Sequence, residues 1–232
     1  MNMQEGLEFL EAKGKGKNSK FAIFQAKDVY HFTSDSILLA NFIQAKKGDN
    51  VADFCAGCGV VGFQFLCNNF EISTLTLIEL QTELIQLAEK TIEYNHLKNV
   101  KVINTSLQEY ANENYREKFD IILCNPPYER GGFAKEKYHI AICRKEITIC
   151  FDEIVQIASK KLKYGGKFVL CHKVERLAEV IYTLHKYGIE PKKLQFIKGK
   201  VEEKPYLFLM EGRKGGKIAL DVLIDVLNMK KN

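Results

Sequence analysis

The chain has 232 residues, of which 46% are hydrophobic and 27% charged, with a formal net charge of +5, and this length holds one doubly wound α/β domain with a small appendage. Its 16 glycines and four prolines are unclustered, which argues against a long disordered or fibrous region, and no uncharged run is long enough to span a membrane. Residues 1–20 are polar and lack the apolar segment of a signal peptide, so we expect a cytoplasmic protein with no membrane partner.

Apolar periodicity predicts strands that alternate with helices. In chain order the expected elements are a strand at 50–54, a helix at 60–68, a strand at 74–80, a helix at 82–95, strands at 100–104 and 119–124, a helix at 146–163, a strand at 167–171, a helix at 174–187, and two late strands at 193–198 and 206–211. Gly165 and Gly166 are expected to end the helix that begins at residue 146. The late strands flank a polar loop, so we expect them to pair antiparallel.

This alternation indicates an α/β fold with a mostly parallel sheet that is covered on both faces and carries an antiparallel C-terminal hairpin. Such sheets bind ligands beyond the carboxyl ends of their strands. Three features fall at these ends: the glycine turn at 55–62, Glu79, and the turn at 125–128. We predict a basic, flexible N-terminal arm over residues 1–20, followed by a single domain over 21–232.

Cysteine usage argues against disulfides and metal. The seven cysteines lie mostly in apolar stretches and are Cys55, Cys58, Cys67, Cys124, Cys143, Cys150 and Cys171. An odd number in such surroundings favours reduced, buried thiols. Cys55 and Cys58 form a C-x-x-C pair, but no second pair has matching spacing and the five histidines are scattered. We therefore predict no metal site.

The glycine turn, DFCAGCGVVG at 53–62, fits two kinds of nucleotide site. Its glycines match the G-x-G-x-x-G pattern of dinucleotide-binding proteins, and Glu79 lies 20 residues past Gly59, where an acid would hold ribose hydroxyls. The turn equally fits the S-adenosylmethionine loop of class I methyltransferases, in which an acid ends the preceding strand as Asp53 does. The turn alone does not separate these interpretations.

The turn Asn125-Pro126-Pro127-Tyr128, called the NPPY turn below, favours methyl transfer to an amine nitrogen. That nitrogen is a poor nucleophile in adenine or an amide, because its lone pair is delocalised. The Asn125 side-chain carbonyl and the Pro126 backbone carbonyl can accept its N–H groups and orient the lone pair, and two prolines hold the backbone rigid. Tyr128 offers a ring face on which a flipped base can stack. A stiff turn explains the prolines but not the asparagine and tyrosine beside them.

The NPPY turn resembles the [DNS]-P-P-[YFW] motif of class I amino-methyltransferases, and other blocks point to one family. HFTSDSILLA at 31–40 is similar to the T-D-[SG]-x-L-L segment of the bacterial tRNA1(Val) adenine-37 N6-methyltransferases, and AICRKE at 141–146 resembles their A-R-x-E segment. Three later blocks also resemble this family: HKVERL at 172–177, YGIEPKK at 187–193 and EGRKGG at 211–216. The resemblance covers residues 20–220 of the chain.

This resemblance implies the class I methyltransferase fold, a Rossmann-like, doubly wound sheet of seven mostly parallel strands. It implies methylation of N6 of adenine 37, with S-adenosylmethionine as cofactor and the tRNA anticodon stem-loop as partner. The implied catalytic residues are Asn125, Pro126, Pro127 and Tyr128. The implied cofactor-binding residues are Thr33, Asp35, Asp53, Ala56, Gly57, Gly59, Glu79, Leu80, Ser106, Leu107 and Asn125. Ser106 stands where many relatives carry aspartate near the adenine ring, and Thr33 with Asp35 equally fits a helix N-cap.

Basic and aromatic side chains outside these motifs are candidates for RNA contact. They are Lys13, Lys15, Lys17 and Lys20 of the N-terminal arm, Phe133 and Arg144 after the NPPY turn, and Lys192, Lys193, Arg213 and Lys214 of the late strands. The lysines equally fit a solvated terminus or edge strands protected from aggregation, and Arg144 equally fits a structural ion pair.

Two rival functions stay open from the sequence, besides a non-catalytic RNA-binding module that retains the fold, against which the intact NPPY turn argues. One is methylation of another amino group, in ribosomal RNA, DNA adenine or a protein glutamine, although enzymes of those classes usually carry an additional recognition domain. The other is an NAD-dependent oxidoreductase, for which no hydride-transfer acid or base has a comparable placement. The sequence is compatible with a monomer or a homodimer.

Overall fold

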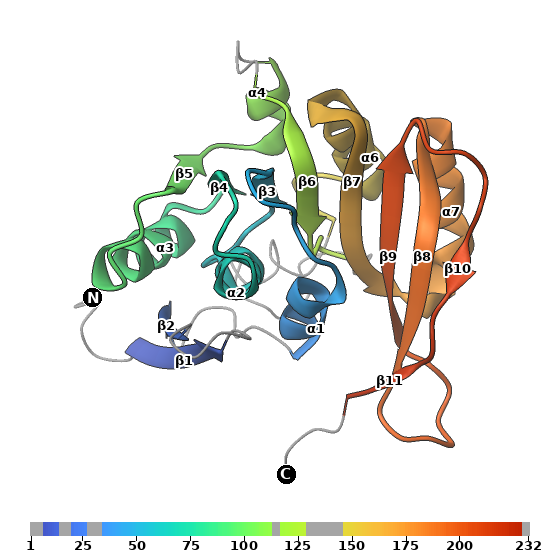
Figure 1. Ribbon diagram of the computed structural model, residues 1–232, viewed down its shortest axis with the longest axis horizontal. Helices are drawn as coiled ribbons and strands as arrows, with labels where there is room; N and C mark the ends of the chain where they lie inside the picture. Colours follow the sequence, from blue (N-terminus) through green and yellow to red (C-terminus); the bar gives the residue numbers. More distant parts are fainter. Residues whose placement is uncertain (1–6, 14–19, 27–33, 113–116, 129–145, 229–232) are drawn as a thin grey trace.

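The computed structural model describes residues 7–13, 20–26, 34–112, 117–128 and 146–228, and its centre is one large sheet between two layers of helices (Figure 1). The helices are α1 (Ser34–Phe42), α2 (Val60–Asn68), α3 (Thr82–Tyr94), α4 (Leu107–Asn112), α6 (Phe151–Lys161), η1 (Val174–Arg176) and α7 (Leu177–Lys186). The strands of the large sheet are β3 (Asn50–Phe54), β4 (Thr74–Glu79), β5 (Val100–Asn104), β6 (Phe119–Cys124), β7 (Leu162–Lys173), β8 (Ile189–Lys198), β9 (Leu207–Lys214), β10 (Asp221–Val222) and β11 (Val226–Leu227).

The strand order is β10-β8-β9-β7-β6-β3-β4-β5, with β11 also paired to β8. Strands β3 to β7 are mutually parallel, whereas β9 runs antiparallel to both β7 and β8. The seven predicted strands are thus confirmed, together with the antiparallel hairpin. Two-residue strands β10 and β11 extend the edge at β8, and strands this short carry no periodicity that a sequence could reveal. The order reverses between β3 and β6, which is where such sheets open a crevice for ligands.

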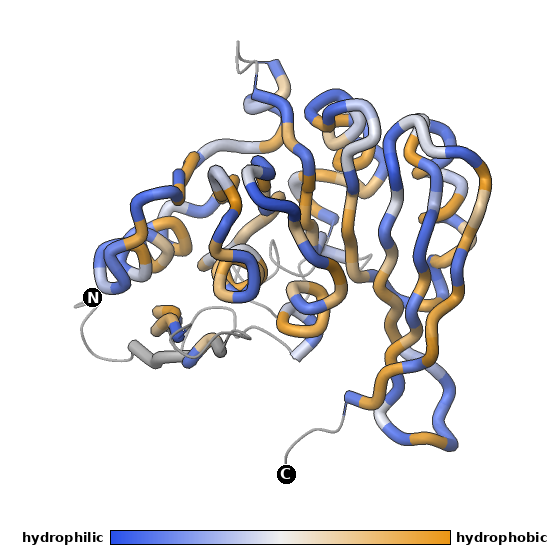
Figure 2. The backbone as a smooth tube through the Cα atoms, in the orientation of Figure 1, coloured by the Kyte–Doolittle hydropathy of each residue, from blue (hydrophilic) through white to orange (hydrophobic). Residues whose placement is uncertain are grey.

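The core lies on both faces of the sheet. Alternate residues of each central strand point to opposite faces, so that Val51 packs towards α1, α2 and α3 while Ala52 packs towards α4, α6 and α7. Figure 2 shows the hydrophobic residues continuing through β6 and β7, as expected for strands covered on both faces. No helix in the described part of the chain has the length and apolarity of a membrane span.

The glycines at 165–166 do not end the preceding helix as predicted. Helix α6 stops at Lys161, and both glycines lie inside β7, where the register against β6 shifts. A Cβ on Gly166 would lie 2.9 Å from the Lys163 carbonyl oxygen, so the close backbone approach requires glycine. The end of α6 is instead held by Lys214, whose ammonium donates to the carbonyls of Ser159 and Leu162.

The N-terminal segment is a paired hairpin over much of its length, which differs from the predicted flexible arm. Strands β1 (Leu7–Lys13) and β2 (Lys20–Ala26) pair antiparallel, with Lys13 opposite Lys20. Ala12, Phe21 and Ile23 are buried in the core beside α2 and α3, which is the apolar contact that orders the hairpin. Residues 14–19, which include Lys15 and Lys17, lie outside the described residues.

Side chains of α3 and its C-cap residue hold the outer edge of β2. The Asn95 amide accepts from the Ala22 N–H at 3.0 Å and donates to the Ala22 carbonyl at 2.9 Å. The Thr91 hydroxyl accepts from the Phe24 N–H at 3.0 Å. These bonds supply what a neighbouring strand would supply.

We predict that Asn95→Ala detaches the hairpin without unfolding the domain. The substitution leaves the Ala22 backbone groups unpaired, which costs about 1–3 kcal/mol. Limited proteolysis followed by mass spectrometry should show faster cleavage within residues 1–30 than in the unaltered chain. Glu93→Ala, at an exposed site on the same helix, is the control and should leave the cleavage rate unchanged; equal rates for both variants would contradict the prediction.

Candidate functional site

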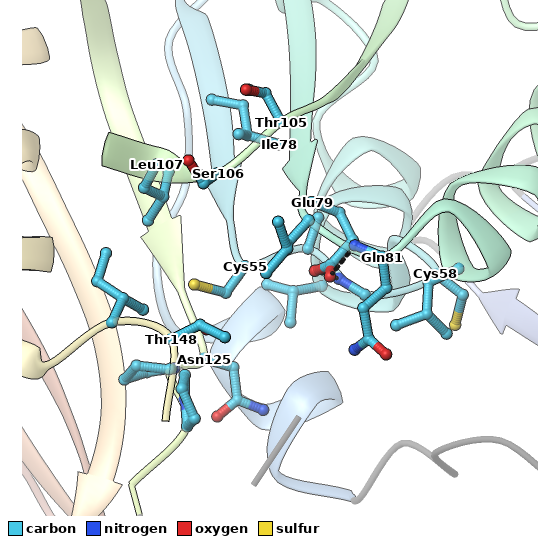
Figure 3. A pocket seen from close by; sticks show the side chains of 18 of the residues that line it. Cys55, Cys58, Ile78, Glu79, Gln81, Thr105, Ser106, Leu107, Asn125 and Thr148 are labelled. Atoms are coloured by element: carbon cyan, nitrogen blue, oxygen red, sulfur yellow. Dashed lines mark hydrogen bonds between the residues drawn. The ribbon is translucent and has the colours of Figure 1, made fainter. Parts of the chain in front are cut away.

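A cavity of about 240 Å³ opens at the carboxyl ends of β3, β4 and β6, beside the reversal of strand order. Many of the predicted site residues line it: Ala56, Gly57, Glu79, Leu80, Ser106, Leu107, Asn125, Pro126, Pro127 and Tyr128. Figure 3 labels Glu79 at the end of β4, Ser106 and Leu107 after β5, and Asn125 after β6, and shows them around the same pocket. The lining also includes residues that the sequence analysis missed, among them Ser36, Gln81, Thr105, Gln108, Thr148 and Ile149.

Gly57 and Gly59 of the glycine turn have different structural roles. Gly57 has φ +58°, and a Cβ built on it would meet no atom within 4 Å, so its backbone is open to the cavity. Gly59 has φ +86°, and a Cβ there would lie 2.5 Å from the Phe63 ring and 2.9 Å from Leu77. Gly59 therefore permits packing of α2 on the sheet and is not a lining residue. The sequence analysis assigned both glycines to the cofactor, and the structure supports this position for Gly57 only.

Glu79 is held rigidly at the end of β4. Its Oε2 accepts from the Gly57 N–H at 2.9 Å and its Oε1 from the Gln81 N–H at 2.9 Å (Figure 3). Burial raises the pKa of this carboxyl, while the backbone hydrogen bonds oppose the rise. Each oxygen retains a lone pair for a donor in the cavity, such as a ligand hydroxyl.

Asp53 lies beneath the glycine turn and not in the cavity lining, which differs from its predicted place against the cofactor. Its Oδ2 accepts from the Gly62 N–H at 2.8 Å, and its buried Oδ1 has no hydrogen-bond partner among the described residues. Burial raises the pKa of Asp53 to about 7; the bond from Gly62 opposes this rise and the nearby Glu79 carboxylate adds to it. Asp53 thus fixes the first turn of α2.

Ser106 lines the cavity with its hydroxyl already engaged. Its Oγ donates to Glu109 Oε2 at 3.0 Å and accepts from the Glu109 N–H at 3.1 Å, which is a capping arrangement at the start of α4. These bonds lower the pKa of Glu109. Only a remaining lone pair of the Ser106 hydroxyl is available to a ligand.

Asn125 lines the cavity and carries a side-chain acceptor without a partner in the described part of the chain. Its Nδ2 donates to the Ser36 hydroxyl at 3.1 Å, which sets the orientation of the amide. The opposite atom, Oδ1, is buried and has no hydrogen-bond partner among the described residues. A buried acceptor without a partner is costly unless a ligand satisfies it. The amide is thus prepared to accept a hydrogen bond from a bound group.

Helix α1 contributes Ser36 to the cavity lining, whereas Asp35, which the sequence analysis assigned to the cofactor, is not part of that lining. Asp35 is buried and accepts from the Tyr206 hydroxyl and the Asn228 amide, both at 3.3 Å, so it joins α1 to the C-terminal strands. Thr33 lies outside the described residues. Ser36 follows Asp35 in the block at 31–40, and its bond to Asn125 becomes visible only when α1 is placed beside β6.

The late basic residues lie away from the cavity. Strand β7 ends at Lys173, which pairs with Leu207, the first residue of β9. Because the two strands are antiparallel, the last residues of β9 lie at the end of the strands away from the cavity. Arg213 and Lys214 lie at that end, whereas Lys192 and Lys193 lie near the middle of β8, where Lys193 pairs with Glu211. Several have internal partners: Lys192 donates to the Lys217 carbonyl, and Lys193 and Arg213 lie 3.6 and 3.9 Å from the buried Glu211 carboxylate.

A different cation lies next to the NPPY turn. The Lys173 ammonium is 5.6 Å from the centroid of the Tyr128 ring. Phe133 and Arg144, which were candidates for RNA contact, lie outside the described residues. Within the described ranges no three His, Cys, Asp or Glu side chains are grouped as metal ligands, and neither Cys55 nor Cys58 of the cavity wall is in a disulfide.

Comparison with known proteins identifies one family and several relatives. The family model described as "Methyltransferase small domain" matches residues 20–183. A curated relative from Shewanella halifaxensis, named tRNA1(Val) (adenine(37)-N6)-methyltransferase, is 24% identical over 80% of this chain and 76% of its own length. Relatives of the same name from Shewanella frigidimarina and Shewanella woodyi are 24% and 25% identical, and the chain spans only 64% and 56% of their lengths.

Solved structures agree on the fold. A predicted O-methyltransferase from Agrobacterium tumefaciens has a TM-score of 0.67 at 19% identity and covers 83% of this chain and 86% of its own. A 16S rRNA N2 G1207 methyltransferase from T. thermophilus, solved with AdoMet and guanosine, has a TM-score of 0.59 at 16% identity and covers 90% of this chain and 51% of its own. At these identities the likeness shows a shared class I architecture.

We predict that Asp53 makes stability fall as pH rises. Because its folded-state pKa is raised from 3.8 to about 7, its stabilising proton is present at low pH and is lost as pH rises through that interval. The free energy of unfolding of the unaltered chain, relative to Asp53→Asn, should fall by up to about 1.4 kcal/mol per pH unit. Urea unfolding of both proteins at several pH values between about 4 and 7 measures this slope.

Asp152→Asn is the control, because its partners Lys186 and Tyr187 lower the pKa of that carboxyl. Asp152 stabilises when ionised and its pKa lies below 3.8, so its effect should stay nearly constant over the same pH range. A pH-independent difference between Asp53→Asn and the unaltered chain would contradict the prediction.

Proposed function

Because this chain belongs to the methyltransferase small domain family, we propose that it methylates N6 of adenine 37 in the anticodon loop of tRNA1(Val). The reaction is a methyl transfer, and the methyl donor is S-adenosylmethionine. Family membership decides between the two nucleotide interpretations of the glycine turn, against an NAD-dependent oxidoreductase. An enzyme that modifies tRNA would act in the cytoplasm.

The observation that carries the proposal is the buried, unpartnered Oδ1 of Asn125. The exocyclic amine of adenine offers two N–H donors, and Asn125 Oδ1 can accept one of them. The Pro126 carbonyl, in a backbone fixed by two prolines, is the natural acceptor for the other. With both N–H groups bound, the nitrogen lone pair points at the methyl donor. Ser36 contributes by binding Nδ2, which leaves Oδ1 as the atom of the amide that is available to accept.

The cavity walls fit the proposed cofactor. Gly57 leaves room for close backbone approach, and the fixed Glu79 carboxylate can accept from the two ribose hydroxyls. Leu80 and Leu107 supply apolar surface for a purine ring. S-adenosylmethionine supplies an activated methyl group on a sulfonium sulfur, so none of these residues has to act as a strong base. The Tyr128 ring offers a stacking surface for the flipped adenine.

We predict that the protein transfers label from S-adenosylmethionine to tRNA that lacks the modification. After digestion to nucleosides, the label should appear in N6-methyladenosine. Asn125→Ala should lower kcat at least tenfold, or about 1.4 kcal/mol of barrier, because the amine loses an orienting acceptor. Cofactor affinity should change by less than about two-fold, since Asn125 is assigned to the acceptor amine.

Asn68→Ala is the matched control, because its amide binds Asn41 at an exposed site on α2. Label in ribosomal RNA, DNA or a protein glutamine, with none in tRNA, would replace the proposed substrate by that one. Unchanged turnover in Asn125→Ala would remove the proposed role of the NPPY turn.

We further predict that Lys173, and not the late basic residues, contacts the RNA backbone. Lys173→Gln should weaken tRNA binding and reduce the slope of log Kd against log salt by about one, as for the loss of one phosphate contact. Lys193→Gln should leave the slope unchanged, because Lys193 lies in the middle of β8 and its ammonium is already 3.6 Å from the Glu211 carboxylate. Filter binding over a series of salt concentrations compares the two, and equal slopes would return the late lysines to consideration.

A further inference from the structure

The segment 172–176 lies against Tyr128, the last residue of the NPPY turn. The His172 ring is 5.7 Å from the Tyr128 ring between centroids, and the Lys173 ammonium is 5.6 Å from the same centroid. Arg176 Nη1 lies 3.5 Å from the Tyr128 backbone carbonyl oxygen. One short stretch after β7 thus reaches both the ring and the backbone of Tyr128.

Arg176 is buried and its guanidinium is fixed by two carboxylates. Nη1 donates to Glu146 Oε1 at 2.7 Å, while Nε and Nη2 donate to the two oxygens of Glu179 at 3.0 and 2.7 Å. Only 8% of the Arg176 side chain is exposed, and 11% of the Glu146 side chain. A guanidinium bound bidentately on one edge has little freedom to rotate, so the position of Nη1 is defined.

The Nη1 contact bears on the geometry of the catalytic turn. The direction of the Tyr128 carbonyl is set by ψ of Tyr128, so a fixed donor near this oxygen restricts the backbone on which the ring is carried. A neutral backbone oxygen facing a buried cation is also favourable electrostatically. Glu146 shares the same nitrogen, so the charge that faces Tyr128 is balanced and stays in place.

The ring of Tyr128 packs against the ring of His172 in β7. His172 accepts from the Lys173 N–H through Nδ1 at 2.9 Å, which places its proton on Nε2. Burial and the nearby Arg176 cation lower the pKa of His172 to about 3, so the ring is neutral at ordinary pH. It packs between Phe151 and Phe208, with centroid distances of 5.2 and 6.3 Å. His172 therefore acts as part of an aromatic wall.

We propose that Arg176 is a positioning residue for methyl transfer, which holds Tyr128 so that its ring meets the target base in the orientation that aligns the amine with the methyl donor. Glu146 and Glu179 orient Arg176. The inference rests on the proposed function for the identity of the base, while the restriction of Tyr128 by Arg176 does not depend on it. A misplaced ring lowers the rate of the aligned reaction without removing the cofactor site.

The absence of tryptophan from the chain allows a direct test. Tyr128→Trp places a single tryptophan at the turn, in a position where the related motif accepts tyrosine, phenylalanine or tryptophan. Time-resolved fluorescence anisotropy then reports the local rotational freedom of this ring. Adding Arg176→Lys or Glu146→Gln to this background should increase the amplitude of fast local motion.

Substitutions of Arg176 in the chain that keeps Tyr128 should separate an effect on positioning from an effect on folding. Arg176→Ala should lower kcat at least tenfold per cofactor-binding site, with KM for tRNA and Kd for S-adenosylmethionine changed by less than about two-fold. Arg176→Lys keeps the charge without the planar fork and should recover part of the loss. Lys186→Ala is the control: it removes a 2.7 Å ion pair to Asp152 from α7, away from the turn, and should leave kcat unchanged.

Three results would overturn the proposal. One is turnover of Arg176→Ala within about two-fold of the unaltered enzyme. Another is a fall in kcat that disappears when activity is expressed per cofactor-binding site, since this would mean only fewer folded molecules. The third is unchanged anisotropy of the tryptophan in Arg176→Lys and Glu146→Gln. If no RNA is methylated by the unaltered enzyme, the proposed function fails, and the anisotropy alone decides on Arg176.

Discussion

Two buried carboxylates hold the glycine turn, and the geometry of the site depends on them. Asp53 at the end of β3 accepts from the Gly62 N–H, and Glu79 at the end of β4 accepts from the Gly57 N–H. The carboxylates come from neighbouring strands, so the sheet itself sets the distance between the two anchor points. Burial raises the pKa of both carboxyls, and the nearby Glu79 carboxylate adds to the rise at Asp53, which makes the arrangement sensitive to protonation. The turn gains a defined shape, and the cavity gains a carboxylate in a fixed orientation.

The opposite wall of the cavity is organised by a different kind of bond. Asn125 follows β6, and its amide takes its orientation from Ser36 of α1. One side of the cavity is thus fixed by backbone donors to acids, and the other by a side-chain pair between elements distant in the sequence. The reversal of strand order between β3 and β6 brings both to one crevice. The proposed sites for the methyl donor and the methyl acceptor meet there at the ends of strands. This arrangement suits a transfer reaction that needs alignment of the reacting groups more than acid or base strength.

Much of this could be predicted from the sequence, because the governing signals are local. The strands, the antiparallel β8–β9 pair and most cavity-lining residues follow from periodicity and from motifs at strand ends. Three features required the third dimension. Gly59 looks like Gly57 in the sequence, yet its missing Cβ faces Phe63. Lys193 and Lys173 are both strand lysines, and only the register shows that Lys173 ends β7 while Lys193 lies in the middle of β8. The apolar residues of β2 order the hairpin because they pack against α2 and α3, and the sequence does not show that these helices lie there.

The contact between Asn95 and Ala22 has a consequence for how the chain behaves at high concentration. An amide that presents one donor and one acceptor to a strand backbone imitates one residue of a neighbouring strand. An outer strand that is already satisfied in this way offers no template for a strand of another molecule. The end of α3 therefore blocks pairing of the outer edge of β2 with a strand of another molecule.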